Sequence, residues 1–312
     1  MTPHSRGLVY GFAASVLWGT VFAAARYLVE VCGLDPLFTA AMRFCGGGLL
    51  LLCWVVMTGG GRGLLRSTQV TGRIILLGLV GTTAMGALVF ISAGYTTSIN
   101  SSLIVNSNAI FIAMFAVLVG ERVKPVHFLG LLIGLIGCSI VMLGSAPPQP
   151  LPPSNNMLGG VTAIGAAVCW AAYTVFGKTT VRSYGGPAVS AWTMIAGGAA
   201  LAGLALLRGG VRPLTGSELL AITYMALAPT AISMGLWYKA LEVVDSAVLG
   251  PSQYVAPLVS VLLGWIMLGE PLGVSFAVGG VLTVIGVHLA TRPAHGGEDS
   301  PQCAGDSTQS DG

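Results

Sequence analysis

The stretch FAVLVGER, Phe115–Arg122, ends a long apolar run with a Gly-Glu pair, and WIMLGEP, Trp265–Pro271, ends another run in the same way. A tryptophan also recurs: Trp18 lies in the first hydrophobic segment of the first half, and Trp170 lies in the first hydrophobic segment of the second half. Motifs that recur in one order indicate an internal repeat. Each half contains five apolar segments, and because five is odd the second copy would enter a membrane from the opposite side. The sequence therefore predicts an inverted repeat.

The composition indicates a membrane protein. The chain has 312 residues, of which 54% are hydrophobic and 8% are charged, too few charges to cover a water-soluble domain. Most apolar runs are roughly 20 residues long, the length of a membrane-crossing helix, and they are too long and too continuously apolar for barrel strands. We predict an all-α integral membrane protein with ten transmembrane helices in two inverted five-helix repeats. The ten predicted spans are 7–29, 36–58, 71–93, 98–119, 125–144, 158–178, 187–207, 217–240, 246–268 and 271–291.

The basic residues predict the orientation. With a cytoplasmic N-terminus, ten of them fall on the cytoplasmic side: Arg6, Arg62, Arg66, Arg73, Arg122, Lys124, Lys178, Arg182, Lys239 and Arg292. Only Arg26, Arg208 and Arg212 fall outside. This bias follows the positive-inside rule, so we expect a multi-pass protein of the inner or plasma membrane with both termini cytoplasmic. The net charge of +3 then serves orientation in the lipid bilayer and requires no nucleic-acid partner.

These features divide the chain into five parts. The predicted parts are a cytoplasmic N-terminus (1–6), a first five-helix repeat (7–144), an outer linker (145–157), a second, inverted repeat (158–291) and a disordered cytoplasmic tail (292–312). The tail is polar and rich in glycine, a composition that cannot bury a core.

Several short motifs give the chain a family resemblance. They are Leu17-Trp18-Gly19, Pro36 with Arg43, Val119–Arg122, Trp170, Leu268–Pro271 and the glycine-spaced last span. In their order, spacing and duplication, over residues 7–291, they resemble the EamA-type, ten-helix branch of the drug/metabolite transporter superfamily. The resemblance implies two five-helix bundles around a central cavity and the carriage of small metabolites, often outward. It names no single substrate, because that family is wide in substrate.

Arg43 is the clearest charge inside a predicted span. It lies seven residues beyond Pro36, about 10 Å along the helix, where an unpaired charge costs at least about 2.5 kcal/mol. No acidic residue lies mid-span, so its partners would be carbonyls, hydroxyls, amides, headgroups or a substrate. Two roles remain open: a structural tie between helices, or a clamp for a substrate carboxylate.

Polar side chains crowd the fourth predicted span and recur on one stripe of the ninth. Such helices avoid lipid and must face protein or a wet cavity. Aligning the two Gly-Glu pairs selects one face, which predicts that Ser101, Asn108 and Gln253 line the cavity, with Asn106 as a second-rank candidate. Hydrogen bonding between helices is the alternative role for these side chains.

Aromatic side chains inside the spans form the remaining candidate set. They are Trp18, Trp170, Tyr173, Trp237, Tyr238 and Tyr254. Trp18 and Trp170 lie near mid-span, so an interfacial aromatic belt does not explain them. Either these rings pack the core, or they line a substrate cavity in which their faces hold an apolar or cationic group.

Glycines spaced at Gly130, Gly134 and Gly137, with Gly279 and Gly286 in the last span, form small-residue faces. Such faces suit close helix packing within the bundle or a homodimer interface. Lys178 and Arg26 end corresponding spans on opposite sides of the membrane. Each could anchor the end of its helix, or each could attract anions to the entrance of the transport path on its side.

The sequence favours a transporter over an enzyme or a scaffold. Its histidines are scattered, it contains no nucleotide-, metal- or hydrolase-type motif, and we expect no cofactor and no metal. One arginine with several amides and aromatics favours an amino acid or related zwitterion, moved by an exporter or exchanger through alternating access. Nucleobase-like and neutral drug-like compounds are the alternative substrates.

Overall fold

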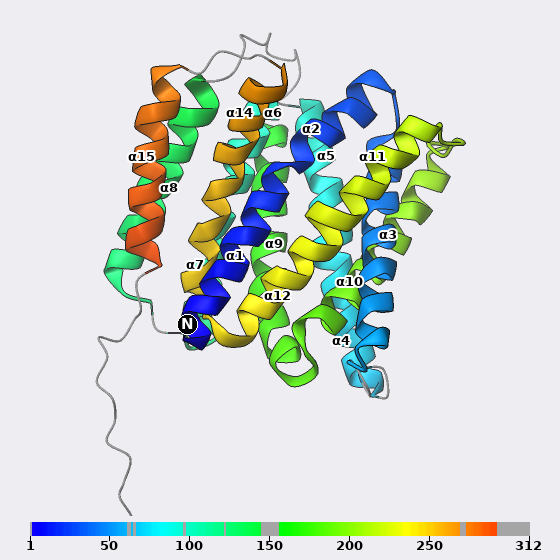
Figure 1. Ribbon diagram of the computed structural model, residues 1–312, viewed down its shortest axis with the longest axis horizontal. Helices are drawn as coiled ribbons and strands as arrows, with labels where there is room; N and C mark the ends of the chain where they lie inside the picture. Colours follow the sequence, from blue (N-terminus) through cyan, green and yellow to red (C-terminus); the bar gives the residue numbers. More distant parts are fainter. Residues whose placement is uncertain are drawn as a thin grey trace, which may run out of the picture.

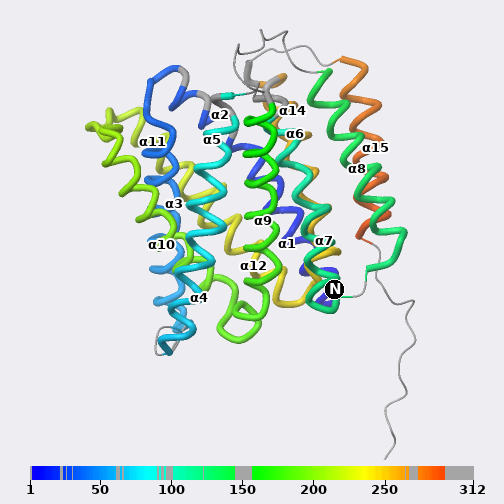
Figure 2. The backbone as a smooth tube through the Cα atoms, turned by 180° about the vertical axis from the view of Figure 1, so that it is seen from behind, coloured from blue at the N-terminus to red at the C-terminus, as the bar shows by residue number. Residues whose placement is uncertain are grey.

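The fold is an all-helical bundle, shown in Figures 1 and 2. The computed structural model describes residues 2–60, 64, 67–95, 98–121, 123–144, 156–268 and 273–291, and these contain no strand. The first half comprises α1 (Pro3–Gly19), α2 (Val21–Arg26), the π-helix η1 (Tyr27–Val31), α3 (Pro36–Met57), α4 (Thr68–Gly78), the π-helix η2 (Leu79–Ala84), α5 (Met85–Tyr95), α6 (Ser98–Asn106), α7 (Asn108–Leu118) and α8 (Pro125–Gly144). The second half comprises α9 (Asn156–Tyr184), α10 (Gly186–Leu207), α11 (Gly216–Ala226), the π-helix η3 (Leu227–Ile232), α12 (Ser233–Val243), α13 (Ser246–Leu249), the 3-10 helix η4 (Gly250–Tyr254), α14 (Val255–Leu268) and α15 (Val274–Ala290).

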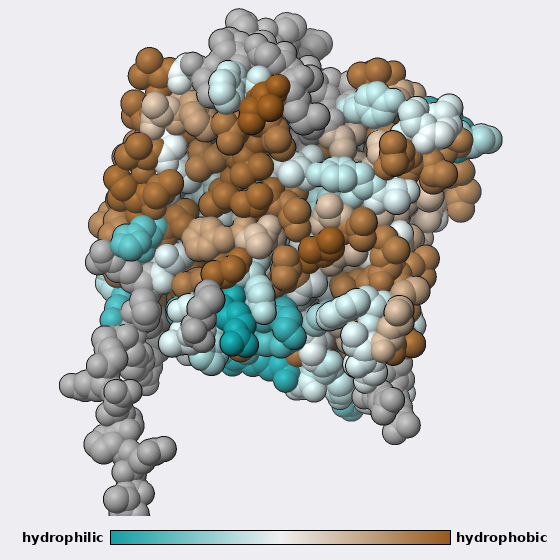
Figure 3. All heavy atoms as spheres, in the orientation of Figure 1, coloured by the Kyte–Doolittle hydropathy of each residue, from teal (hydrophilic) through white to brown (hydrophobic). Residues whose placement is uncertain are grey.

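Eight helical stretches among the described residues are long and apolar enough to cross a membrane. They are Pro36–Met57, Thr68–Val89, Ser101–Leu118, Pro125–Gly144, Met157–Tyr184, Gly186–Leu207, Gly216–Val243 and Ser246–Leu263. Val274–Ala290 is a shorter apolar helix, and the chain before α3 is divided at Thr20 into α1 and α2. The all-helical membrane class is therefore confirmed. Figure 3 shows hydrophobic side chains across the middle of one face and hydrophilic ones gathered at its lower edge, where the N-terminus lies.

The Gly-Glu pair has a clear structural role in the first half. Gly120 follows α7 with a φ of +86°, a conformation that favours glycine. The Glu121 N–H donates to Ala116 O at 2.8 Å and the Gly120 N–H donates to Val117 O at 3.0 Å. This bonding closes the helix as glycine-terminated helices commonly do, and it places Glu121 directly at the end of α7. The matching pair Gly269-Glu270 lies outside the described residues.

Two of the predicted spans depart from straight α-helix at matching places. The stretches α4–α5 and α11–α12 each contain a π-helix, η2 and η3 respectively. In η3, Pro229 lacks an N–H to donate, and the Thr230 hydroxyl instead donates to Met225 O at 2.7 Å. The fourth span, which we expected to be continuous over 98–119, is divided at Ser107 into α6 and α7.

The glycine faces of α8 and α15 pack against each other within the chain (Figures 1 and 2). A Cβ added at Gly130 would lie 2.7 Å from Gly286 O, and one at Gly137 would lie 2.6 Å from Gly279 O. As the residue number rises along α8, the number of the residue that it contacts on α15 falls, so the two helices run antiparallel. Of the two uses expected for these glycines, the structure shows packing within the bundle. A homodimer stays a prediction and would need other faces of these helices.

The helices α3 and α10 form a second antiparallel pair across the two halves. A Cβ at Gly48 would lie 2.8 Å from Ile195 Cγ1, and one at Gly198 would lie 2.7 Å from Cys45 Sγ. Further contacts also cross between the halves, since α1 packs on α12 and α14, while α9 packs on α5 and α7. The two halves therefore interlock into one bundle.

Replacing Gly286 by leucine should force α8 and α15 apart, because a Cβ there would overlap the backbone of Gly134. We expect a loss of about 1–3 kcal/mol, measured as a lower midpoint of thermal unfolding of the purified protein in detergent. Val284→Leu is the matched control, because Val284 is 62% exposed on the same helix. An unchanged midpoint in Gly286→Leu would contradict this packing.

Candidate functional site

The structure brings three tryptophans from three helices together in the middle of the bundle. The rings of Trp18 (α1) and Trp170 (α9) meet edge to face with their centroids 5.4 Å apart. The Trp237 ring (α12) lies 5.1 Å from Trp18 and 6.4 Å from Trp170 between ring centroids. We call Trp18, Trp170 and Trp237, together with Tyr173, the ring cluster.

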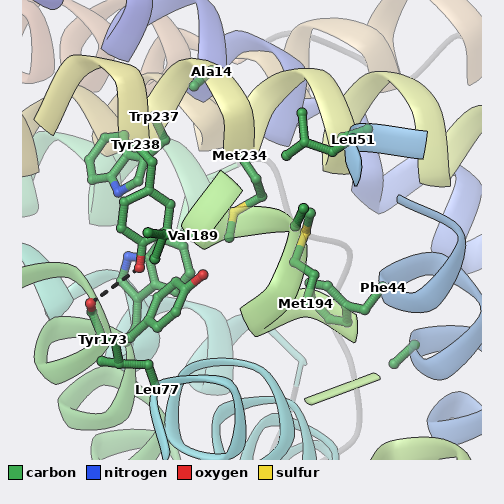
Figure 4. Close-up of a cluster of buried hydrophobic side chains, with 14 of the residues drawn as sticks. Ala14, Phe44, Leu51, Leu77, Tyr173, Val189, Met194, Met234, Trp237 and Tyr238 are labelled. Atoms are coloured by element: carbon green, nitrogen blue, oxygen red, sulfur yellow. Dashed lines mark hydrogen bonds between the residues drawn. The ribbon is translucent and has the colours of Figure 1, made fainter. Parts of the chain in front are cut away.

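Within the ring cluster, Tyr173 lies on the side of α10, and Tyr238 packs against it (Figure 4). The Tyr173 ring lies 5.5 Å from Trp170 and 5.2 Å from Tyr238 between centroids. Its hydroxyl shares a hydrogen bond of 2.8 Å with the Thr193 hydroxyl. The Tyr238 hydroxyl donates to Tyr173 O at 3.3 Å. The resemblance implied a central cavity, but in this conformation Tyr173 and Trp237 are fully buried and Trp170 is 7% exposed. A substrate could reach this level only if helices or rings moved.

Gln253 joins the ring cluster from the ninth predicted span. The Trp170 indole N–H donates to Gln253 Oε1 at 2.8 Å in a buried position. Gln253 lies in η4, one turn beyond Gly250, and a Cβ at Gly250 would lie 3.4 Å from Ile112 Cγ2 of α7. Asn108 lies one turn before Ile112, towards the same end of the bundle as Gln253. Of the three residues that the alignment selected, Asn108 and Gln253 therefore lie towards one end of the α7–η4 contact, and a role for them in substrate binding stays a prediction.

Buried polar atoms at this level have no hydrogen-bond partner among the described residues. They are Trp237 Nε1, Gln253 Nε2 and Asn108 Oδ1. Each unpaired buried group costs about 1–3 kcal/mol, so such groups call for an explanation. Two are donors and one is an acceptor. A bound molecule that carries both an acceptor and a donor would satisfy them.

Three other predicted residues lie away from the rings in this conformation. Asn106 donates to Ser102 O of its own helix at 2.8 Å, and its Nδ2 lies 3.8 Å from Met142 Sδ of α8. Ser101 is buried on α6, which packs on α9. Tyr254 is buried in a separate cluster with residues of α8 and α15, and its ring lies against Gly134. A role for these three in substrate binding stays a prediction.

Arg43 has a hydroxyl partner. Its Nε donates to Thr230 Oγ1 at 2.9 Å, and its guanidinium carbon lies 4.6 Å from the centroid of the Phe44 ring. Because the Thr230 hydroxyl in turn donates to Met225 O, Arg43 connects α3 to the π-helix η3. This geometry favours the structural role over a carboxylate clamp.

A double-mutant cycle on Arg43→Gln and Thr230→Val tests this connection. Each single variant should lower the unfolding free energy, because each removes one member of the same hydrogen-bonded chain. We expect the two losses to be non-additive by about 0.5–3 kcal/mol, measured by denaturant titration in detergent. Additive losses would show that Arg43 acts elsewhere, as a clamp would.

Sequence reasoning missed an ionic cluster at the end of the bundle where the N-terminus lies. The Lys178 ammonium (α9) lies 2.5 Å from Glu121 Oε1 and 2.6 Å from Asp245 Oδ1. The Lys178 side chain is 6% exposed and that of Glu121 is 9% exposed. Glu121 also accepts hydrogen bonds from the Ser246 hydroxyl at 2.8 Å and the Ala247 N–H at 3.2 Å. This ionic staple of Lys178, Glu121 and Asp245 fastens α9 to the end of α7 and the start of α13.

A cavity of about 530 Å³ opens beside the ionic staple. Val119, Val175 and Phe176 supply its apolar wall, and Arg73 and Arg182 add two further charges to the staple residues. Its position is the end of the bundle, whereas the resemblance implied a cavity at the centre. The sequence offered one signal for this ionic staple: Lys178, Glu121 and Asp245 all lie at span ends in a chain with few charges.

Comparisons with known proteins agree with this fold. The model of the EamA-like transporter family matches residues 5–143 and again 157–292. An uncharacterized transporter of Archaeoglobus fulgidus is 29% identical over 265 residues, which are 84% of this chain and 90% of that protein. The uncharacterized inner membrane transporter YedA of Escherichia coli K12 is 28% identical over 292 residues, which are 89% of this chain and 90% of that protein. A protein of solved crystal structure, 25% identical, superposes with a TM-score of 0.80 over 91% of this chain and 95% of that one.

The helical fold, the apolar spans and these relatives together define an integral membrane transporter. The chain belongs to the EamA-like transporter family, which matches it once in each half.

Proposed function

We propose that this transporter carries amino acids or related zwitterions, outward or in exchange, by alternating access, and that the ring cluster with Gln253 and Asn108 binds the substrate. The observation that carries the proposal is the set of unpaired buried atoms at that level: Trp237 Nε1, Gln253 Nε2 and Asn108 Oδ1. A carboxylate would accept from the two donors, and an ammonium group would donate to Asn108 Oδ1. The indole faces suit an apolar side chain.

Ten spans in two inverted repeats form part of the same proposal. Its support is that one shift along the chain relates two contacts between α8 and α15. Gly130 corresponds to Gly279, and Gly137 to Gly286, at the shift of 149 residues that separates the two Gly-Glu pairs. The contacts of Gly130 with Gly286 and of Gly279 with Gly137 exchange under that shift. Corresponding helices that pack antiparallel are what inverted topology requires.

Alternating access needs a centre that opens to one side at a time. In this conformation the rings fill the centre and the ionic staple fastens one end, which fits a state closed at that end. Opening there would separate Lys178 from Glu121 and Asp245.

The π-helices η2 and η3 lie at matching places in the two halves, and π-bulges often occur at functional sites where a helix bends. A Cβ at Gly197 would lie 2.5 Å from Thr82 Cβ of η2, and one at Gly47 would lie 2.6 Å from Thr230 Cγ2 of η3.

We further propose that the stapled end is cytoplasmic, and that the protein crosses the inner or plasma membrane with both termini inside. The supporting observation is the gathering of Arg73, Lys178 and Arg182 at that end. Positive charge is retained on the cytoplasmic side of membrane proteins.

Removing the polar groups at the ring cluster should reduce transport. Gln253→Leu and Asn108→Leu keep the approximate volume of each side chain but delete the groups that face the substrate. We expect each to reduce exchange of radiolabelled amino acids in proteoliposomes by about tenfold, which corresponds to one hydrogen bond to a charged group. The control is Gln69→Leu, at an exposed position near the start of α4.

Equal yield and unfolding midpoint across the three variants would show that folding is intact. Undiminished exchange in both Gln253→Leu and Asn108→Leu would contradict the site. A panel with a nucleobase and a neutral aromatic drug separates the alternative substrates, which a group of three indoles also suits. Exchange of those compounds without exchange of any amino acid would favour the alternative.

A further inference from the structure

The residues that line the cavity at the stapled end include more positive charges than the ionic staple neutralises. Among the described residues that line it are three cations, Arg73, Lys178 and Arg182, and two carboxylates, Glu121 and Asp245. Lys178 contacts both carboxylates, and Arg182 lies 3.5 Å from Asp245 Oδ1. One positive charge is therefore in excess among these residues, which is complementary to a single anionic group.

Arg73 holds the excess charge. Its Nη2 donates to Phe176 O at 3.0 Å and to Thr179 Oγ1 at 2.5 Å, and both acceptors are neutral. Arg73 and Arg182 are exposed, whereas Lys178 is 5% exposed and still lines the cavity. A guanidinium has five N–H donors in a planar fork, so Arg73 can bind a carboxylate and keep its bonds to α9.

The size of the cavity suits a small solute. Its volume of about 530 Å³ falls in the range of about 300–1,000 Å³ that is typical of small-molecule sites. Val119, Val175 and Phe176 add apolar surface to the lining, and the Asp245 side chain is 50% exposed. The lining therefore offers a complementary group to each part of a solute with a carboxylate, a short apolar part and a cationic group.

We propose that this cavity is the loading site for a carboxylate-bearing solute, which binds Arg73 and Arg182 and competes with Glu121 and Asp245 for Lys178. The proposal rests on the proposed function and adds where the substrate first binds and what loosens the staple. A carboxylate that takes Lys178 leaves Glu121 and Asp245 without their shared cation. That loss weakens the connection between α7, α9 and α13, so that binding itself favours opening at this end.

Acetate is the minimal probe of this site. The purified full-length protein in neutral detergent is titrated with sodium acetate at ionic strength held constant with sodium chloride, and the unfolding midpoint gives an apparent Kd. We expect Arg73→Gln and Arg182→Gln to raise the Kd about tenfold each, as for loss of a charged hydrogen bond. Arg208→Gln is the matched control, since Arg208 is an exposed arginine that caps α10 at the opposite end. An unchanged Kd in both Arg73→Gln and Arg182→Gln would overturn the proposal.

Gln253→Leu separates this proposal from the proposed function. Acetate binding that is unchanged by Gln253→Leu but weakened by Arg73→Gln supports the loading site, whether or not central variants reduce exchange. Acetate binding that Gln253→Leu abolishes, with Arg73→Gln neutral, would place the carboxylate at the ring cluster and overturn the loading site. Exchange that ignores Gln253→Leu while the Arg73-dependent binding persists would contradict only the proposed function.

A phospholipid headgroup shares the anionic chemistry and is tested separately. The same titration is made in nanodiscs of phosphatidylcholine, with and without phosphatidylglycerol. We expect acetate to act in both, with the same dependence on Arg73. Stabilisation by phosphatidylglycerol that requires Arg73, with no effect of acetate, would identify a lipid site and overturn the proposal.

Loosening of the staple has its own readout. Ser246 is fully buried and bonded to Glu121. The variant Ser246→Cys is made in a chain whose native cysteines are replaced by alanine. The rate at which this cysteine reacts with a water-soluble maleimide then reports opening of the stapled end. We expect acetate to accelerate this reaction about tenfold, the equivalent of one lost charged hydrogen bond, and to have no such effect when Arg73→Gln is added. A rate that acetate leaves unchanged would contradict competition for Lys178.

Discussion

Close antiparallel contact between helices of opposite halves is the constraint on which the other features of this bundle depend. Apolar side chains gain little by packing against each other in lipid, so helices associate through close backbone approach and polar contacts. The pairs α8 with α15 and α3 with α10 achieve that approach through glycines, and each pair takes one helix from each half. The two halves are thereby held together while α1, α7, α9, α12 and η4 meet at the centre. That is where the ring cluster, Gln253 and Asn108 lie.

The centre and the stapled end have different physical properties. At the centre, aromatic rings pack in contact and leave polar atoms of Trp237, Gln253 and Asn108 unpaired among the described residues. At the stapled end, Glu121 is heavily bonded, to Lys178 and to two residues of α13. Removing one partner from a buried ion pair costs about 3–5 kcal/mol, a barrier that a competing carboxylate would lower. The unmet hydrogen bonds at the centre and the ion pairs at the stapled end are the two features on which the proposed alternating access rests.

Much of the fold was predictable because hydrophobic length is a strong signal. The expected span 36–58 matches α3 (Pro36–Met57), and 125–144 matches α8. Trp18 and Trp170 could be paired because their repetition is visible in the sequence, whereas Trp237 was a candidate only as an aromatic residue inside a span. The alignment of the Gly-Glu pairs selected Ser101, Asn108 and Gln253 as one face, of which Ser101 lies away from the rings. The π-helices were not predicted: Pro229 is a local signal in η3 because it lacks an N–H, whereas η2 contains no proline. The ionic staple was missed because Asp245 lies between two spans, and only folding brings it to Lys178. Tyr254 was assigned to the cavity from its type alone, whereas its packing against Gly134 depends on how α8 approaches η4.

Opening of the stapled end on substrate binding would increase the distance between spin labels placed on either side of the ionic staple. Leu118 ends α7 and is 76% exposed, and Ser183 is exposed on α9, five residues beyond Lys178, so nitroxide labels at these two positions should perturb little. Pulsed electron paramagnetic resonance in nanodiscs would be recorded without substrate and with a saturating amino acid that the protein exchanges. We expect one short distance without substrate and a second, longer population with it. A single distribution unchanged by a substrate that is demonstrably exchanged would contradict the account.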